Sequence, residues 1–368
     1  MTPVDGPTFR LWSCALPSPA LPTERIRRAI EPIWQHIDAS PRHAGPRMSE
    51  GLRAARTLGS KERPVAGDVL TGLIRHHRAL ERIDRDDTVP KPTWAPPGLL
   101  RAWYSLCEHG IPVLDDPPNA YAIAVSMPDD VADEWWARLG PDRAIAHART
   151  LAGRAPMTLR VLREGFTLPV PFRRVGERAI VLEGRLNLDI EPAYRDGFVE
   201  IQDLGSQAIV DATWAWLGKG ARVLDLCAGA GGKSLSLAAL GADVQAWDVR
   251  MKALHELEQR AVRARLQVEI GHPSGRYDLV LVDAPCSGTG VLRRHPENRW
   301  RMEIPTDTQR ALLRQALTLA PQVVYATCSL LRRENEDLVR SVVEPVDEQT
   351  IWPEDEGGEG FYWASVRG

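Results

Sequence analysis

The first part of the chain has its hydrophobic residues at helical spacing. Apolar side chains recur every three or four positions within residues 23–83, as at Ile26, Ile30 and Ile33. This period predicts amphipathic helices, each with one face buried. The same spacing returns within residues 129–153, and residues 99–107 carry a shorter helical pattern between turn signals. We therefore expect the N-terminal part of the chain to be helical.

The pattern changes from residue 221 onward. Short runs of β-branched and aliphatic residues alternate with helical segments, which is typical of βαβ units with strands buried on both faces of a doubly wound parallel sheet. Residues 155–209 alternate short apolar runs with charged turns and predict a small α+β module. The predicted strands of the C-terminal part are residues 223–226, 244–247, 268–270, 279–282, 323–326 and, at the end, 360–366.

Composition narrows the class of protein. The chain has 368 residues, 43% of them hydrophobic, which is enough for a large core and more than one domain. A net charge of −3 excludes a global basic field, although a local patch could still bind nucleic acid. Five widely spaced cysteines without a CxxC pair predict neither a disulfide framework nor a zinc site. No apolar stretch reaches the ~20 residues of a membrane span. We expect a soluble cytoplasmic protein without a metal.

A glycine-rich turn follows the first predicted strand of the C-terminal part. Residues 223–234 have the sequence VLDLCAGAGGKS, in which Gly229, Gly231 and Gly232 permit a ligand to approach a helix N-terminus closely. The turn lacks both the phosphate-loop spacing and the GxGxxG fingerprint, because Ser234 occupies the final glycine position. By itself it is compatible with NAD, FAD or S-adenosylmethionine.

Two aspartates make an adenosyl cofactor the favoured choice. Asp225 lies within the first strand, where it can order the turn, and Asp248 follows the second strand. An acidic residue at the second position is placed to accept the ribose hydroxyl groups of a nucleoside cofactor. Each aspartate alone could be a helix cap.

Two cysteines lie just past separate apolar runs. Cys286 lies in YDLVLVDAPCSGTG, residues 277–290, and Cys328 lies in VVYATCS, residues 323–329. The carboxyl ends of parallel strands line the ligand crevice of an open α/β sheet. Asp283 precedes Cys286 by three residues, and two thiols with a carboxylate there suggest covalent chemistry. The alternative is that both cysteines are small core residues.

These motifs together resemble the RsmB/Sun family of RNA (cytosine-5) methyltransferases. The resemblance is strong over residues 150–368, and GSKER at 59–63 resembles more faintly the helical N-terminal extension of the ribosomal-RNA branch. It implies a Rossmann-like domain that uses S-adenosyl-L-methionine as cofactor. The segments that carry it are CAGAGGKS at 227–234, DAPCSGTG at 283–290, TCS at 327–329, YRDGFVEIQD at 194–203, RRHPE at 293–297 and GFY at 360–362.

The resemblance implies a role for each catalytic residue. Cys328, in the TC context, would be the nucleophile that adds to carbon-6 of cytosine, and Cys286 would assist product release. Asp283 would stabilise the base through N3 and its exocyclic amine. The target would be an unpaired or flipped cytosine, since carbon-6 is shielded in a stacked base. Ribosomal RNA is the favoured substrate.

The resemblance also implies the ligand-binding residues. Two departures from the family pattern are mild, Ala230 in place of proline and Lys252 in place of arginine. The third is larger, because GHPS at 271–274 lacks the carboxylate that contacts adenine, for which Glu269 or His272 could substitute. The expected cofactor-binding residues are Cys227, Ala228, Gly229, Ala230, Gly231, Gly232, Lys233, Asp248, Lys252 and Asp283, and the expected RNA-binding residues are Arg160, Arg195, Arg293 and Arg294.

Three alternatives stay open: a methyltransferase for transfer RNA or another RNA, a catalytically weak RNA-binding ribosome assembly factor, and a dehydrogenase. The dehydrogenase would leave both cysteine motifs unexplained. We expect a monomer of four segments: a helical, RNA-binding-like region at 1–88, a linker with a helical segment at 89–150, a small α+β RNA-binding module at 151–210 and a Rossmann-like catalytic domain at 211–368.

Overall fold

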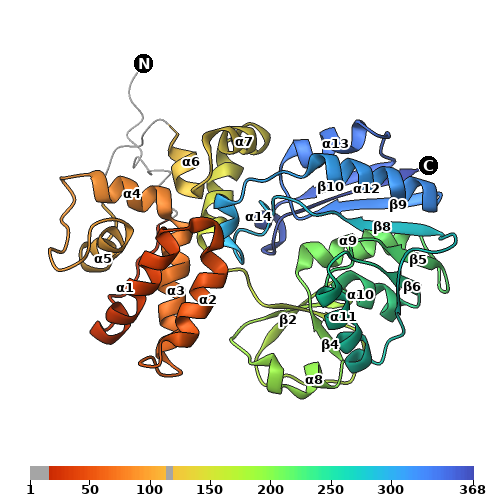
Figure 1. Ribbon diagram of the computed structural model, residues 1–368, viewed down its shortest axis with the longest axis horizontal. Helices are drawn as coiled ribbons and strands as arrows, with labels where there is room; N and C mark the ends of the chain where they lie inside the picture. Colours follow the sequence, from red (N-terminus) through yellow and green to blue (C-terminus); the bar gives the residue numbers. More distant parts are fainter. Residues whose placement is uncertain (1–15, 113–118) are drawn as a thin grey trace. The chain divides into compact units, whose positions relative to one another are not determined.

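The computed structural model of the protein describes residues 16–112 and 119–368 (Figure 1). By its contacts the chain forms two compact units. The first comprises the described part of Met1–Arg154 together with Leu292–Met302, and the second comprises Ala155–Val291 with Glu303–Gly368. The finer division into four segments stays a prediction.

The first unit is helical, as the spacing of its apolar residues predicts. In the first helix Ile26, Ile30, Ile33 and Ile37 form one buried face, and the Thr23 hydroxyl accepts a hydrogen bond from the Ile26 amide (3.4 Å). The helices are α1 (Glu24–Asp38), α2 (Ala44–Ala54), α3 (Glu62–Arg75), α4 (His77–Arg85), α5 (Leu99–His109), α6 (Ala120–Val125) and α7 (Asp129–Ala152), with the short 3₁₀ helix η2 (Pro41–His43).

Residues 292–302 fold with this helical unit, although the sequence groups them with the catalytic domain. Their 3₁₀ helix η4 (Pro296–Trp300) carries Arg299, whose buried guanidinium donates to the Val125 carbonyl (3.0 Å). Arg75 of α3 donates to the carbonyl of Arg293 (3.0 Å). Arginine–carbonyl hydrogen bonds of this kind satisfy backbone groups that would otherwise be buried without partners. No local sequence pattern predicts them, because their partners are far apart in the chain.

The second unit begins with a small antiparallel sheet in the order β2-β3-β1-β4. The apolar runs of this segment predicted β1 and β3. The strands β2 and β4 are short, contain charged residues and were not predicted. A helical turn, α8 (Pro192–Arg195), precedes the last strand. The strands are β1 (Thr158–Val161), β2 (Phe172–Val175), β3 (Ala179–Leu182) and β4 (Val199–Ile201).

The main sheet has seven strands in the order β10-β11-β9-β8-β5-β6-β7. The five expected parallel strands are confirmed, but the sheet is mixed because β11 runs antiparallel to both of its neighbours. β10 lies in the acidic tail, where no strand was predicted, since its side chains alternate between exposed and half-buried positions. The strands are β5 (Arg222–Asp225), β6 (Asp243–Ala246), β7 (Glu269–Ile270), β8 (Leu279–Asp283), β9 (Gln322–Thr327), β10 (Asp347–Ile351) and β11 (Phe361–Arg367).

Helices cover both faces of this sheet (Figure 1). Leu313 and Leu338 on one side, and Val210 and Leu237 on the other, are almost completely buried against the strands. No helix of the described ranges is long and apolar enough to cross a membrane. The covering helices are α12 (Thr306–Leu319) and α13 (Glu336–Arg340) on the first face, and α9 (Leu204–Ala215), α10 (Gly232–Leu240) and α11 (Met251–Ala264) on the second.

Candidate active site

The two motif cysteines meet at the carboxyl edge of the main sheet. β8 and β9 are parallel neighbours in which Asp283 pairs with Ala326, so the loops that follow them leave the sheet side by side. The Sγ atoms of Cys286 and Cys328 lie 3.3 Å apart, and both side chains are partly exposed. The structure therefore brings together two thiols that are 42 residues apart in the chain.

Cys286 binds its proton more tightly than an ordinary cysteine does. The hydrogen bond with Cys328, together with burial, raises the pKa of Cys286 well above its ordinary value. Cys286 therefore keeps its proton at neutral pH, so its S–H group is able to donate in this contact.

A lysine of the glycine loop faces the thiol pair. Lys233 Nζ donates to Asp283 Oδ2 at 2.7 Å, and its side chain is only 9% exposed. Burial by itself would lower the pKa of Lys233, but the Asp283 carboxylate raises it above the usual value, and Cys328 acts in the same direction. The lysine is therefore positively charged between a carboxylate and a thiol. Its ion pair with Asp283 spans 50 residues, and nothing in the local sequence predicts it.

The glycine loop between β5 and α10 has the backbone geometry that its composition predicts. Gly229 and Gly231 both have positive φ angles, +54° and +83°. A Cβ atom at Gly231 would lie 2.3 Å from Leu257 Cγ, whereas one at Gly232 would meet nothing within 4 Å. Gly231 is also the N-cap of α10 and supplies no side-chain cap. The first-turn amides of α10 therefore lie beside open space and can bind polar groups of a ligand.

Asp225 is buried at the end of β5 and is only half satisfied. Its Oδ2 accepts a hydrogen bond from Ser234 Oγ at 2.6 Å, whereas Oδ1 has no partner among the described residues. Burial raises the pKa of Asp225 to about 7. A buried polar atom without a partner is costly, so this oxygen is a candidate acceptor for a donor group of a bound ligand.

Asp248 lies beyond β6 and is fully hydrogen-bonded. Its two oxygens accept from the amides of Gly229 and Arg250, both at 2.8 Å, and from the Arg250 guanidinium at 2.9 and 3.0 Å. Burial would raise the pKa of Asp248, but the bonds from Arg250 lower it below the usual value, so the group is ionised. The Arg250 side chain is 69% exposed. Arg250 is not among the predicted cofactor-binding residues, although it lies only two positions after Asp248.

The other predicted cofactor residues have mixed surroundings. Burial raises the pKa of Cys227 to about 12, so its thiol is neutral. The Ala228 amide donates to the Trp247 carbonyl (2.9 Å), and the Ala230 carbonyl accepts from Arg260 (2.5 Å). Lys252 is exposed on α11.

A ring pair stands where the adenine-contacting carboxylate is missing. The imidazole of His272, which follows β7, lies over the indole of Trp247 with ring centroids 4.0 Å apart. Val249 next to Asp248 is 84% exposed. These groups together fit a nucleoside-containing cofactor. They are the ionised carboxylate of Asp248, the uncapped first-turn amides of α10, the unpartnered oxygen of Asp225 and the exposed side chain of Val249.

Two of the four arginines predicted to contact RNA are corrected by the structure. Arg160 is 1% exposed, and its Nη1 donates to Asp211 (2.9 Å). Arg293 is 9% exposed and donates to the Arg154 carbonyl (2.5 Å) within the helical unit. Both guanidinium groups bind protein acceptors instead of facing solvent, so neither is presented to a phosphate. Arg195 and Arg294 are exposed and remain predictions.

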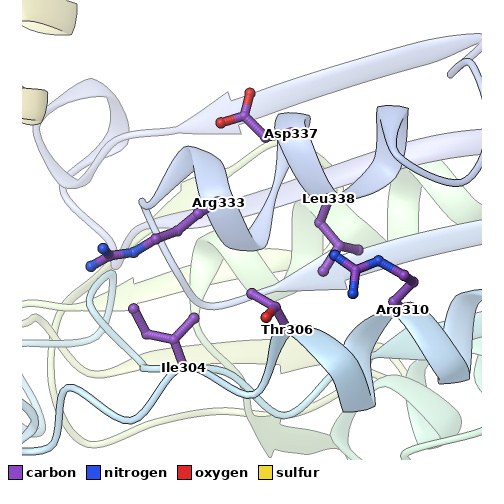
Figure 2. Close-up of a pocket in the computed structure, with 6 residues that line it drawn as sticks. All are labelled: Ile304, Thr306, Arg310, Arg333, Asp337 and Leu338. Atoms are coloured by element: carbon purple, nitrogen blue, oxygen red, sulfur yellow. The ribbon is translucent and has the colours of Figure 1, made fainter.

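A cavity of about 410 Å³ lies elsewhere on the second unit (Figure 2). Figure 2 shows Arg333 of the 3₁₀ helix η5 (Arg332–Glu334) and Arg310 of α12 at either end, with Thr306 between them. None of its lining residues is a predicted site residue. They are Ile304, Thr306, Arg310, Arg333, Asp337 and Leu338.

Comparisons with known proteins agree with the motifs. Residues 213–351 match the family described as 16S rRNA methyltransferase RsmB/F. The ribosomal RNA small subunit methyltransferase B of Erwinia tasmaniensis is 26% identical over 367 residues, covering 89% of this chain and 78% of that protein. That of Serratia proteamaculans is 33% identical over 208 residues, covering 48% of each. The chain spans about half the length of several such relatives.

Two solved structures share the fold. The crystal structure of PH0851 has a TM-score of 0.71 at 19% identity, covering 96% of this chain and 100% of that one. A methyltransferase homolog from Pyrococcus horikoshii has a TM-score of 0.56 at 21% identity, covering 67% of this chain and 97% of that one. The expected fold class is confirmed: an α/β, Rossmann-like domain preceded by a small α+β module and a helical region.

Proposed function

We propose that this chain, whose residues 213–351 match the family of 16S rRNA methyltransferases RsmB/F, methylates carbon-5 of a cytosine in RNA through a covalent cysteine–cytosine adduct. The observation that carries the proposal is the meeting of two thiols, a carboxylate and a charged lysine at one edge of the sheet. A dehydrogenase would have no use for the two thiols.

Cys328 is the nucleophile. Carbon-5 of cytosine is a poor nucleophile until a thiolate adds to carbon-6, which forms a carbon–sulfur bond and moves electron density onto carbon-5. The Cys286 S–H group donates to the sulfur of Cys328 at 3.3 Å, and the charged amine of Lys233 acts on the same sulfur. A hydrogen-bond donor and a positive charge beside this sulfur suit it to the role of nucleophile.

Asp283 binds the base during this addition. Negative charge develops on the ring as the thiolate adds, and a proton delivered to N3 neutralises it. Asp283 is one-third exposed, so a base can reach it, and Lys233 fixes its carboxylate at 2.7 Å. Asp283 therefore contacts the base at N3 and the exocyclic amine.

The glycine loop and Asp248 hold the cofactor. S-adenosyl-L-methionine, when bound, supplies an electrophilic methyl group. Asp248 would accept hydrogen bonds from the ribose hydroxyl groups, and the Arg250 side chain would have to move away from the carboxylate to permit this. The first-turn amides of α10 and the free oxygen of Asp225 bind the polar end of the molecule.

Cys286 serves the last step. After carbon-5 is methylated it still carries its proton. As the bond between carbon-6 and the Cys328 sulfur breaks, Cys286 gives its S–H proton to the departing sulfur and takes the carbon-5 proton in its place. Cys286 lies 3.3 Å from that sulfur, close enough to assist the release. The retained proton on Cys286 also keeps it from competing as the nucleophile.

Ribosomal RNA is the substrate that the relatives favour, because those of Erwinia tasmaniensis and Serratia proteamaculans are named ribosomal RNA small subunit methyltransferases. Transfer RNA is the competing substrate.

The experiment is tritium transfer from labelled S-adenosylmethionine to protein-free small-subunit ribosomal RNA and, separately, to transfer RNA. RNA that contains 5-fluorocytidine is used in parallel to trap the adduct. We expect label in ribosomal RNA at one cytosine, located by bisulfite sequencing. Cys328→Ala should abolish both label and adduct, whereas Cys286→Ala should still form the adduct. An adduct that survives in Cys328→Ala and is lost in Cys286→Ala would reverse the assignment of the two cysteines.

A further inference from the structure

A buried polar network lies directly behind the two thiols. Its centre is Glu334, which ends η5 six residues after Cys328 and is completely buried. Its carboxyl group accepts hydrogen bonds from the Ser287 amide (2.9 Å) and from Ser287 Oγ (2.5 Å). It also accepts from Ser329 Oγ (2.5 Å) and from Gln309 Nε2 (3.0 Å). We refer to Glu334, Ser287, Ser329 and Gln309 as the Glu334 network.

The network connects the two cysteine loops to each other. Ser287 follows Cys286 directly in the chain, and Ser329 follows Cys328 directly. One carboxyl group therefore bonds the residue next to each thiol. The two serine hydroxyls also lie within 3.3 Å of each other. Thr289 Oγ1 lies near the same two hydroxyls, 3.4 Å from Ser287 Oγ and 3.2 Å from Ser329 Oγ, but Glu334 in addition accepts from Gln309 of α12.

We propose that Glu334 is a positioning residue for the methyl-transfer reaction: it holds the loops after β8 and β9 so that the sulfur atoms of Cys286 and Cys328 stay in contact. The inference rests on the proposed function, in which the two thiols divide the work. Glu334 is completely buried, so it acts on the reaction through the cysteine loops and touches neither RNA nor cofactor.

Hydrogen-bond accounting supports this role. All four groups around the carboxyl are donors, so Glu334 serves only as an acceptor. Removing the acceptor would leave buried donors without a partner. A neutral amide in its place would direct its own N–H groups at some of these donors.

The network is anchored on both sides to rigid elements. Gln309 belongs to α12 and donates from the same amide nitrogen to the Pro285 carbonyl (2.8 Å), next to Cys286. The hydroxyl of Tyr325 in β9 donates to the Glu334 carbonyl (2.9 Å). The chain neighbours of Gln309 and Glu334 are Arg310 and Arg333, which line the cavity in Figure 2.

The sensitivity of the chemistry to position makes the role testable. An S–H···S contact is weak and depends on close approach, and a misplacement of about 1 Å in an active site can lower the rate roughly 100-fold. Loosening the loops should therefore reduce the turnover number without changing how RNA binds.

The test compares Glu334→Gln with the wild-type protein and with Asp337→Asn, an exposed acidic position in the same segment. The first measurement is the rate at which iodoacetamide alkylates each cysteine across pH 6–9, read by peptide mass spectrometry. It needs neither RNA nor cofactor. We expect the ratio of the Cys328 rate to the Cys286 rate to fall at least ~5-fold in Glu334→Gln, because separated thiols lose the contact that distinguishes them. Asp337→Asn should keep the wild-type ratio.

The second measurement is steady-state methyl transfer. We expect kcat to fall ~100-fold in Glu334→Gln, with the KM for RNA unchanged. An unchanged alkylation ratio in a folded Glu334→Gln protein would overturn the positioning role. A changed ratio in a wild-type protein that methylates no RNA would instead contradict the proposed function and leave the positioning of the thiols intact.

Two milder variants cover the case in which Glu334→Gln does not fold. Ser287→Ala and Ser329→Ala each remove one hydroxyl arm of the Glu334 network and leave the carboxylate in place. Each should shift the alkylation ratio in the same direction by a smaller factor, in a protein whose circular dichroism matches the wild type. A wild-type ratio in both would overturn the proposal.

Discussion

Two regions lie at the same edge of the main sheet but are held in different ways. One is the glycine loop between β5 and α10, called the cofactor loop below after its proposed role, and the other is the pair of cysteine loops that follow β8 and β9. In the cofactor loop the Gly229 amide donates a hydrogen bond to Asp248. Asp248 also pairs with the guanidinium of Arg250, a side chain that is 69% exposed. The cysteine loops are fastened to Glu334, which is completely buried. An exposed ion pair contributes little and exchanges readily with solvent, whereas a buried network of satisfied hydrogen bonds is rigid.

The difference matches the role that we propose for each region. In the proposed reaction a cofactor enters and leaves, and the acceptor atoms of Asp248 are covered by a side chain that a ribose can displace. The two thiols of the proposed reaction keep one geometry through addition and release, and buried hydrogen bonds fix the residues beside them. Lys233 joins the two regions, because it starts in the cofactor loop and ends on Asp283 beside the thiols.

Removing the link between the two regions should have the largest effect. Lys233→Met keeps the approximate length of the side chain but removes the charge that holds Asp283 beside the thiols. We expect methyl transfer to fall ~100-fold in kcat, the scale of losing one preorganised electrostatic contact. Lys219→Met, at an exposed position of the same unit, should be neutral. A Lys233→Met enzyme with wild-type kcat would mean that the two regions work independently.

The buried carboxyl group under the cofactor loop should show itself in the pH dependence of stability. The pKa of Asp225 is about 7 in the folded protein and near 3.8 when unfolded. Between these values the folded state binds more protons, so this group lowers the free energy of unfolding as pH rises from about 4 to about 7. Asp225→Asn removes the contribution.

The measurement for Asp225 is the Tm of the wild-type and Asp225→Asn proteins from pH 4.5 to 7.5. The stability of the variant relative to the wild type should rise with pH, by about 3 kcal/mol between pH 4.5 and 7.5, or a few degrees in Tm. Contributions of other titrating groups cancel in the Tm difference between variant and wild type. The Tm of Asp243→Asn, a change at an exposed position on β6, should vary with pH as the wild-type Tm does. A constant difference between Asp225→Asn and wild type would show that Asp225 is ionised throughout.

The smallest effect is expected at the exposed ion pair. Arg250→Ala frees the oxygens of Asp248 for a ribose while leaving the amide bonds from Gly229 and Arg250 intact. An exposed pair is worth at most ~1 kcal/mol, so the Kd for S-adenosylmethionine should tighten by up to about 5-fold by calorimetry. Arg276→Ala is the matched exposed control. Weaker binding by Arg250→Ala would make Arg250 a cofactor ligand instead of a displaceable cover.

Local pattern predicted most of the fold because it depends on residues that are close in the chain. The runs that became β5, β6, β8 and β9 were all recognised from their β-branched residues, and so was the glycine turn between β5 and α10. The same reasoning failed at β10, whose alternating charged residues have no apolar run, and for the direction of β11, which depends on its pairing with β9.

For the candidate site, the sequence by itself determined which residue types stand at the strand ends: Asp225 and Asp248 on two strands, and the two cysteines on two others. Only the tertiary structure decided their partners. It placed Cys286 against Cys328, Lys233 against Asp283 and Glu334 behind both thiols, and it buried Arg160 against Asp211. The physical reason is that strand formation follows a period of two within a few residues, whereas these contacts depend on sheet order and on side chains up to 51 positions apart.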